Sequence, residues 1–238
     1  LLDRARGVLV ERRVDGPEYS VEIMGGEAVG LTRKHLGSPP YFVEVGHDHP
    51  ADVPAEVTEE LTATAVRAVR AVGLTTGPAH VELRLPPEEP PVVIEINPRL
   101  AGGLIPRLVA HATGRDLVAE TVAHAARLPV GTVARRTGFA AVRFVVPGRD
   151  GVVAAVRGVA DAAARPGVVE AGCSVAPGTR IVVEHSFRDR RGHVIGAGPT
   201  AGDAVAAAER GLADIVITYT PPPRDEEGAG RARRRIAQ

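Results

Sequence analysis

The sequence is short of cysteine, of aromatic residues and of net charge. Its single cysteine, Cys173, excludes an intrachain disulfide and any zinc site built on several thiolates, and it fits a reducing compartment. Lysine plus arginine and aspartate plus glutamate number 29 each, so no net field attracts nucleic acid or an anionic membrane. Specific side chains must therefore do any binding.

Long hydrophobic runs are also missing. No run approaches the roughly 20 apolar residues that cross a bilayer, and no signal peptide is visible, so we expect a cytoplasmic protein without membrane association. The 238 residues, 44% of them hydrophobic, are enough for one large or two small domains. Because the chain opens at Leu1 in the approach to a strand, we expect it to be the later part of a longer protein.

The first 130 residues are expected to form an antiparallel sheet with packed helices. A loop rich in Pro and Gly at 35–50 leads to a helix from about Pro54 to Val72, which ends at Gly73, and two later helices are separated at Gly114. The expected apolar stripe of the first helix is Val57, Leu61, Ala65, Ala68 and Val72. The predicted strands are VLVERRV (8–14), EYSVEIM (18–24), AVGLTR (28–33), AHVELRL (79–85) and VVIEIN (92–97).

Residues beyond 138 are expected to form a second, smaller α+β unit with a helix that begins near Ala201. A change in composition at 130–138 indicates a domain junction, which divides the chain into domains 1–130 and 131–220. The segment 221–238 is low in apolar residues and rich in Pro, Gly and charge, so we expect it to be disordered. The strands predicted in the second unit are 139–146, 151–158, 179–186 and 193–198.

The stretch VVIEINPRL (92–100) joins an apolar strand to an unusual set of polar groups. Alternation along the strand places Glu95 and Asn97 on one face, and Arg99 follows the proline. Arg99 offers a planar fork that suits phosphate or carboxylate. The question is what a strand end of this composition is built to hold.

We expect this strand to pair with the strand at 79–85 as an antiparallel hairpin. Directly opposed carboxylates about 4.5–5.5 Å apart at Cβ destabilise a sheet unless something compensates for them. Mg²⁺ does so naturally, because it accepts carboxylate and amide oxygens and completes its shell with phosphate oxygens and water. A solvent-facing sheet with two unrelated glutamates is the alternative, and spacing alone leaves it open. The expected pairs are Leu85 with Val92, Glu82 with Glu95 and His80 with Asn97.

Several segments together resemble the ATP-grasp superfamily, in particular the carboxylate-amine ligases that include L-amino-acid ligases. The most specific is the last, because a Glu-x-Asn-x-Arg strand end with an upstream Glu is the family's metal signature. The resemblance implies the C-terminal half of an ATP-grasp fold, followed by a smaller α+β ligase domain that residues 139–217 resemble. The segments are VLVERRVDGPEYSVE (8–22), YFVEVGHDHPA (41–51), GPAHVEL (77–83) and VVIEINPRLAGGLIPRLVAHATGRDL (92–117).

The resemblance implies that the chain binds ATP with Mg²⁺ or Mn²⁺. Glu82, Glu95 and Asn97 match the residues that hold one or two metal ions against the ATP phosphates. Arg99 matches the arginine that steadies the transferred phosphate or the acyl phosphate. His80 alone is expected to be structural.

A second group of residues matches the nucleotide-binding hinge of the family. Glu11, Arg12 and Val14 match the segment that lines the adenine pocket, partly through backbone atoms, and Glu18 matches the acid that accepts hydrogen bonds from the ribose hydroxyls. For Glu11 and Glu18 the alternative is an ordinary exposed strand residue.

Three residues are candidates for substrate contact. Gly102 and Gly103 follow Arg99, where a chain without Cβ can approach a substrate carboxylate or oxyanion and supply N–H donors. A turn at the helix entry is the simpler alternative for these glycines, and both can hold. His47 matches a loop beside the amino-acid pocket, whereas His49 and Lys34 are weaker candidates.

The implied reaction activates a carboxylate with ATP as an acyl phosphate, which an amine attacks to form an amide or peptide bond. Its substrates would be small-molecule carboxylates and amines, amino acids in particular. Such chemistry needs charge neutralisation and positioning more than a protein nucleophile, and no Ser-His-Asp set is evident. Two alternatives stay open: a purine-biosynthetic or carboxylase-type ATP-grasp enzyme, and a non-catalytic remnant that serves as a scaffold.

Part of the nucleotide site that the family places before the hinge has no counterpart in the sequence. We therefore expect the chain alone to hold half of the site and to bind Mg-ATP weakly or not at all. The only feature that favours nucleic acid is the run RARRR at 231–235, a solvated type of sequence, so we expect no such partner. The oligomeric state, a homodimer included, is left open.

Overall fold

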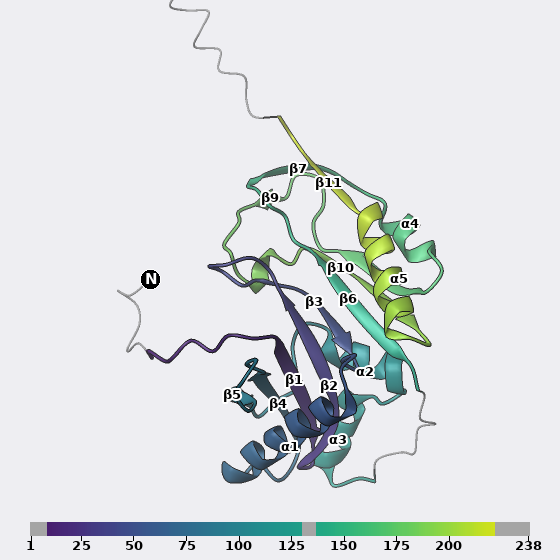
Figure 1. The fold of residues 1–238 in the computed structure, drawn as a ribbon. Helices are drawn as coiled ribbons and strands as arrows, with labels where there is room; N and C mark the ends of the chain where they lie inside the picture. Colours follow the sequence, from purple (N-terminus) through teal and green to yellow (C-terminus); the bar gives the residue numbers. More distant parts are fainter. Residues whose placement is uncertain (1–8, 130–136, 222–238) are drawn as a thin grey trace, which may run out of the picture.

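The computed structural model describes residues 9–129 and 137–221 (Figure 1). Most of the predicted domain junction at 130–138, and all of the predicted tail except Pro221, lie outside the described residues. The described residues form the expected α+β fold, in which helices pack on antiparallel sheets. Among these residues, no helix is long and apolar enough to span a membrane.

The larger of the two sheets carries the structure. Within the described residues it has eight strands in the order β5-β4-β1-β2-β3-β6-β10-β8, and every pairing between neighbours is antiparallel. In that order the bounds are β5 Val92–Asn97, β4 Pro78–Arg84, β1 Glu18–Met24, β2 Glu27–Leu36, β3 Glu44–His49, β6 Phe139–Val145, β10 Gly192–Gly198 and β8 Val168–Cys173.

A smaller sheet and the helices complete the described fold. This sheet has the order β11-β7-β9, with β11 Val216–Tyr219, β7 Gly151–Arg157 and β9 Arg180–Ile181. The strand expected at 179–186 is therefore reduced to two residues. The sequence pattern does not predict strands β8 and β11 or helix α4 (Val159–Ala164). The helices are α1 Ala55–Ala71, α2 Ile105–Thr113, α3 Leu117–Ala126, α4 Val159–Ala164 and α5 Ala201–Asp214, with a 3₁₀ turn at Phe187–Asp189.

Strand β3 lies where the sequence predicts only a loop, and it joins the two halves of the larger sheet. It pairs with β2 on one side and with β6 on the other (Figure 1). Its sequence EVGHDH lacks apolar alternation, so the pattern gave no strand signal. Gly46 permits the close approach, since a Cβ there would lie 2.6 Å from the carbonyl oxygen of Val142. The two-domain division stays a prediction, but its two parts share one continuous sheet.

The strand predicted at 8–14 is wrong over the described residues. Residues 9–17 form no strand, and Leu9 and Val10 are 81% and 87% exposed. Both edges of β1, the next strand along the chain, are already occupied by β2 and β4. A β-prone sequence needs a partner to form a ladder, and residues 9–17 pair with none of the described strands.

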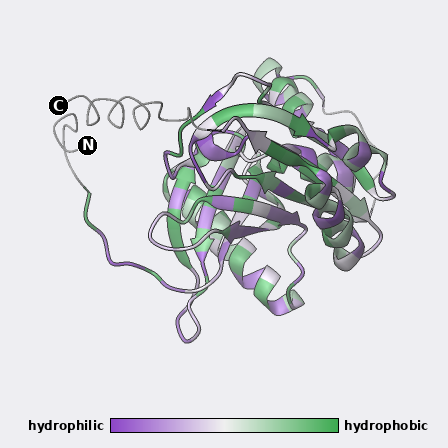
Figure 2. Ribbon diagram, turned by 90° about the horizontal axis from the view of Figure 1, so that it is seen from above, coloured by the Kyte–Doolittle hydropathy of each residue, from purple (hydrophilic) through white to green (hydrophobic). Residues whose placement is uncertain are grey.

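The two faces of the larger sheet differ in chemistry. On one face α1 packs over Val21 of β1 and α5 packs over Ala141 of β6. On the other face α2 packs over Val142 of β6. Because side chains alternate along a strand, Glu18 and Glu22 point to the α2 face. Figure 2 shows helices that carry hydrophobic and hydrophilic residues in alternation, as expected when one helix face rests on a sheet.

Helix α1 confirms the predicted span but shifts its buried stripe. Its fully buried residues are Leu61, Ala65 and Val69, which are four apart. Val72, expected at the end of the stripe, is 59% exposed. The stripe contacts the apolar side of β1 and β4, and Gly73 ends the helix with a φ of 77° as expected.

Helix α5 lies directly on β10 because that strand carries glycine at the contact. A Cβ on Gly196 would lie 2.3 Å from the carbonyl oxygen of Ala204 and 2.6 Å from the nitrogen of Ala208. Ala204 and Ala208 are buried against Ala141 of β6. Small residues on both elements therefore set the short separation between helix and sheet.

Three histidines are buried on the α2 face of the sheet. Burial disfavours the charged ring and lowers the pKa of His47 to about 3 and that of His49 to about 4. Burial would also lower the pKa of His80, but its hydrogen bonds to Glu22 at 2.9 Å and Glu82 at 3.1 Å raise it to about 9. His47 and His49 are therefore neutral near pH 7, whereas His80 is charged.

We expect Gly196→Ala to lower the free energy of unfolding by about 1–3 kcal/mol, because the added methyl group must push α5 away from β10. The matched control is Gly202→Ala in the first turn of α5, where the nearest atom to an added Cβ is 3.9 Å away. That control should be neutral or stabilise by up to about 1 kcal/mol. Urea denaturation measures both, and equal stability of the two variants would contradict the close contact.

The stability of the folded chain should be greatest near pH 6.5, the pKa of an unfolded histidine. His47 and His49 titrate lower when folded, so their contribution is complete above pH 6.5 and is lost as pH falls toward 4. His80 titrates higher when folded, so its contribution is complete below pH 6.5 and is lost as pH rises through 9. Each group changes the free energy of unfolding by up to about 1.4 kcal/mol per pH unit inside its window.

Urea denaturation from about pH 5 to about pH 9 tests this dependence. His49→Gln should flatten the acid side of the profile and leave the alkaline side unchanged. A profile without a maximum, or one in which His49→Gln flattens the alkaline side, would show that the assignment is wrong.

Candidate active site

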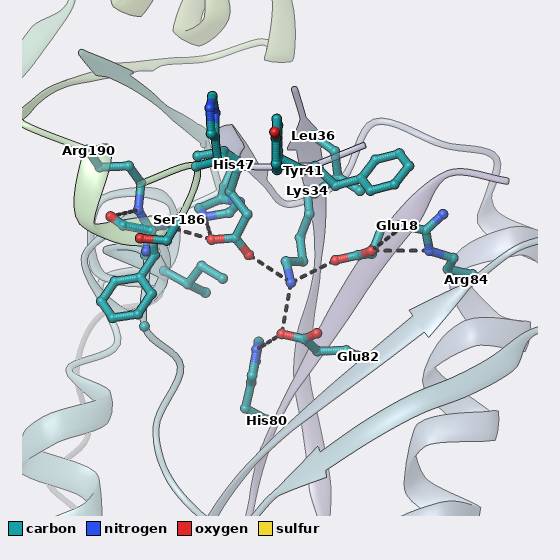
Figure 3. Close-up of a pocket in the computed structure, with 18 of the residues that line it drawn as sticks. Glu18, Lys34, Leu36, Tyr41, His47, His80, Glu82, Arg84, Ser186 and Arg190 are labelled. Carbon is teal, nitrogen blue, oxygen red and sulfur yellow. Dashed lines mark hydrogen bonds and ion pairs between the residues drawn. The ribbon is translucent and has the colours of Figure 1, made fainter. Parts of the chain in front are cut away.

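A cavity of about 590 Å³ lies on the α2 face of the larger sheet (Figure 3). Strands β1 to β4 form its floor, and the segments 99–105 and 185–190 form two of its walls. A volume of this size suits a small-molecule ligand. The lining residues are Glu18, Lys34, Leu36, Tyr41, Phe42, Val43, Glu44, His47, His80, Glu82, Arg84, Arg99, Gly102, Gly103, Ile105, His185, Ser186, Phe187 and Arg190.

Lys34 stands at the centre of the cavity floor. Its Nζ lies 2.8 Å from a carboxylate oxygen of each of Glu18, Glu44 and Glu82 (Figure 3). Lys34 comes from β2, and the three glutamates come from β1, β3 and β4. The lysine side chain is only 3% exposed. Side chains from four strands therefore meet at one ammonium group.

Further cations stand behind the three carboxylates. Arg84 lies 2.8 Å from Glu18, Arg190 lies 2.7 Å from Glu44, and His80 donates to Glu82 at 3.1 Å. The other ring nitrogen of His80 lies 2.9 Å from Glu22, which fixes the orientation of the ring. Each carboxylate is thus held from two sides.

These contacts keep the acids ionised although they are partly buried. Burial would raise the pKa of Glu82, but the hydrogen bond from His80 and the charge of Lys34 lower it to about 2. The pKa of Glu44 also falls below its usual value, because Lys34 outweighs burial there. Burial would lower the pKa of Lys34, yet the three carboxylates raise it above its usual value. Lys34, Glu44 and Glu82 are therefore charged at neutral pH.

The hairpin of β4 and β5 has the register that the sequence predicts at its polar end. Glu82 lies opposite Glu95, and His80 lies opposite Asn97. The predicted pair of Leu85 with Val92 is wrong, because the register shifts by one after Glu82 and places Arg84 opposite Val92.

The shift in register arises from an extra residue, Ile94, which is 42% exposed. This bulge lets Val93 and Ile96 both pack against the apolar core under α1. Glu95 and Asn97 are thereby left on the polar face. The core contacts therefore explain why the polar end of the hairpin keeps its register while the other end slips.

The donor set on this hairpin fits a divalent metal that is shared with phosphate oxygens. Glu82 and Glu95 supply carboxylates, and Asn97 supplies an amide whose buried Nδ2 has no hydrogen-bond partner among the described residues. In the described ranges, no group of three or more His, Cys, Asp or Glu side chains could hold a metal ion by itself. Mg²⁺ commonly takes a few protein oxygens and completes its shell with phosphate and water.

The predicted substrate contacts lie together on one wall. Arg99 lines the cavity, and its Nη1 donates to the carbonyl of Leu100 at 2.9 Å. Gly103 has a φ of 59°, and a Cβ there would lie 2.5 Å from Nε2 of His47, so glycine is required. A Cβ added at Gly102 would have no neighbouring atom within 4 Å among the described residues. His47 is fully buried behind Gly103, and neither ring nitrogen has a hydrogen-bond partner among the described residues.

Of the predicted hinge residues, only Glu18 lines the cavity. The carbonyl of Val14 accepts a hydrogen bond from Arg84 at 3.2 Å. Glu11 and Arg12 are exposed and do not line the cavity, and Arg12 pairs with Glu89 at 3.0 Å. His49 is buried away from the cavity, where it bonds to Thr32 at 2.9 Å.

Lys34 and its partners Glu44, Arg84 and Arg190 are the residues that the sequence reasoning missed or ranked too low. Counting outward from the turn at Gly25 and Gly26 would place Glu18 opposite Arg33. A bulge after Glu22 moves Glu18 to Lys34 instead. Arg190 reaches Glu44 across 146 positions, a separation at which no local pattern carries a signal.

Two family models match the chain. Residues 2–107 match the ATP-grasp domain, and residues 143–220 match the L-amino acid ligase C-terminal domain 2. The first match contains the β4–β5 hairpin and Lys34 with its three glutamates, and the second contains Arg190 and strands β8 and β10.

Curated relatives and solved structures extend these matches. Uncharacterized protein y4rH of Sinorhizobium fredii is 38% identical over 214 residues, which cover 90% of this chain and 45% of that protein. Carnosine synthase 1 of Gallus gallus is 32% identical over 126 residues, which cover 51% of this chain and 13% of that protein. The chain thus spans less than half the length of these relatives.

The crystal structure of the L-amino acid ligase from Bacillus licheniformis shares the fold, with a TM-score of 0.78 and 22% identity. The superposition covers 88% of this chain and 53% of that one. The match therefore includes both halves of the continuous sheet. The family matches therefore assign residues 2–107 to the ATP-grasp domain family and residues 143–220 to the family of L-amino acid ligase C-terminal domain 2, and the shared fold agrees with both.

Proposed function

We propose that this protein is an ATP-dependent ligase that joins a carboxylate to an amine through an acyl phosphate, with amino acids as its substrate class. The observation that carries the proposal is the pairing of Glu82 with Glu95 beside the cavity. Lys34 and His80 already offset the charge of Glu82, and a metal shared with ATP would offset the charge of Glu95 opposite it. The match to the L-amino acid ligase C-terminal domain supports amino acids over the purine-biosynthetic or carboxylase-type alternative.

Magnesium or manganese would be held by Glu82, Glu95 and Asn97, and when bound it would offset charge on the ATP phosphates. Glu82 is already ionised and oriented by its contacts with Lys34 and His80. Glu95 is exposed, so it is accessible to a metal and nucleotide that arrive together. The hairpin thus supplies one fixed and one accessible carboxylate.

Arg99 and the glycines after it would position the reacting groups. The guanidinium of Arg99 is exposed at the cavity wall, where it can contact a transferred phosphate. Gly102 borders open space, so its backbone N–H can approach a substrate oxygen. His47 adds a buried neutral ring with no hydrogen-bond partner among the described residues, and it stands behind Gly103 as a candidate contact for the amino-acid substrate.

The nucleoside would extend along the segment before β1. Glu18 lines the cavity and retains lone pairs for the ribose hydroxyls beside its bonds to Lys34 and Arg84. The adenine would lie farther along, near Glu11, Arg12 and Val14. Residues 9–17 form no strand, so their backbone can make such contacts apart from the carbonyls of Val14 and Pro17, which accept hydrogen bonds from Arg84 and Leu85.

Lys34 sets the charge of this site. Without its ammonium, Glu18, Glu44 and Glu82 would face one another without a central cation, and the order of the cavity floor would be lost. The lysine therefore acts as a positioning residue that keeps the carboxylates ionised and in place.

ATP-dependent phosphate release with a panel of amino acids tests the proposal, with the protein expressed from its complete gene. Glu95→Gln keeps the size of the side chain and removes a metal-binding charge, so the rate should fall by about 100-fold or more. The matched control is Glu88→Gln in the exposed loop of the same hairpin, which should retain the wild-type rate. Failure of every amino acid to stimulate release, with the protein folded, would favour a scaffold without catalysis.

We expect Lys34→Met to lower the free energy of unfolding by about 3 kcal/mol, because it leaves three partly buried carboxylates without their shared partner. The control is Arg12→Met, which breaks an ion pair whose two side chains are 65% and 50% exposed and should leave the free energy of unfolding nearly unchanged. Urea denaturation at neutral pH compares the two. A Lys34→Met variant as stable as Arg12→Met would show that the cluster does not organise the site.

A further inference from the structure

A second cavity of about 480 Å³ adjoins the first. The two share Gly103, Phe187 and Arg190 as lining residues, so they are neighbouring compartments of one site. The second cavity extends over β6, β10 and β8 of the C-terminal half of the sheet. Neither the sequence motifs nor the role proposed for the first cavity gives it a function.

The floor of the second cavity is a row of directly paired residues. His193 of β10 lies opposite Phe144 of β6 and opposite Gly172 of β8. Because Gly172 has no side chain, the space beside the His193 ring stays open. A Cβ at this position would lie 3.3 Å from Cε1 of that ring. Leu104 and Phe187 form apolar walls. The compartment therefore offers apolar and aromatic surface around an open floor.

The polar groups of this compartment are few and carry no acid. None of the described residues that line it is an Asp or a Glu. The ring of His193 is held by Glu170 at 2.7 Å. Arg190, which separates the compartments, donates from Nη1 to Glu44 at 2.7 Å and from Nε to the carbonyl of Phe187 at 3.2 Å. Its Nη2 donates to none of the described residues, so both N–H groups of this nitrogen are left for an anion.

We infer that the second cavity holds the side chain of the amine substrate, an α-amino acid with an aliphatic or aromatic side chain. The substrate carboxylate would bind Arg190, and its amine would then point into the first cavity. A cationic side chain finds no carboxylate in the lining, and the volume suits a bulky apolar group. This inference rests on the proposed ligase function, because only a reaction that joins two molecules needs two compartments.

Cys173 offers a direct readout of occupancy that does not depend on catalysis. It is the single cysteine of the chain, it is partly exposed, and it lines the second cavity. The rate at which the thiol reacts with Ellman's reagent should fall several-fold when phenylalanine or leucine is added, with Mg-ATP or without it. Glycine and lysine should leave the rate unchanged.

Two variants test whether the protection of Cys173 arises in the second cavity, and a third variant serves as a control. Gly172→Val fills the floor, and Phe187→Ala removes a wall residue that is 66% exposed and so does not threaten folding. Both should abolish the protection of Cys173 by phenylalanine. Gly148→Val, which adds the same side chain where nothing lies within 4 Å, should retain it.

The inference and the ligase proposal fail in different ways. If neither phenylalanine nor leucine slows the labelling of Cys173 under either condition, the second cavity is not the side-chain compartment. If the protein from the complete gene releases phosphate with phenylalanine as the amine, Gly172→Val should raise the KM for phenylalanine at least tenfold and leave that for glycine unchanged. Equal effects on both would overturn the inference while the ligase function stands, whereas no release with any amino acid would refute the ligase function itself.

Discussion

The ammonium group of Lys34 among three carboxylates is the interaction on which the site depends. It draws Glu18, Glu44 and Glu82 from three strands toward one point, each at 2.8 Å from the same nitrogen. Like charges this close would otherwise repel, and burial would favour their neutral forms. The lysine thus fixes both the shape of the cavity floor and the charge state of the acid that also faces Glu95. The arginines behind it only complete the arrangement.

The sequence predicted the parts of the site whose register depends on a single short loop. Counting along β4 and β5 placed Glu82 opposite Glu95 correctly, but missed the bulge at Ile94 that displaces Val92. The same kind of bulge after Glu22 concealed Lys34. A bulge arises because core contacts on the other face outweigh regular pairing, and no alternation pattern shows which contact will win.

The fold was predictable to a similar degree and for similar reasons. The α+β class and the long helix α1 follow from strand alternation, helical spacing and the family resemblance. Strand β3 does not, because its partners β2 and β6 supply the reason for its extended form. The strand expected at 8–14 shows the reverse case, in which a suitable sequence pairs with no strand among the described residues. Tertiary context therefore decided both exceptions.

The central position of β3 limits how the protein can move. A hinge between the two halves would have to break the ladder on one side of β3, where Gly46 allows the backbones to approach closely. The continuous sheet beneath both compartments is therefore rigid. The loops that bring Tyr41 and His185 into a stack at 3.7 Å line the first cavity and lie outside this ladder. A change in the shape of the cavity mouth therefore requires these loops to move but does not require the ladder beside β3 to break.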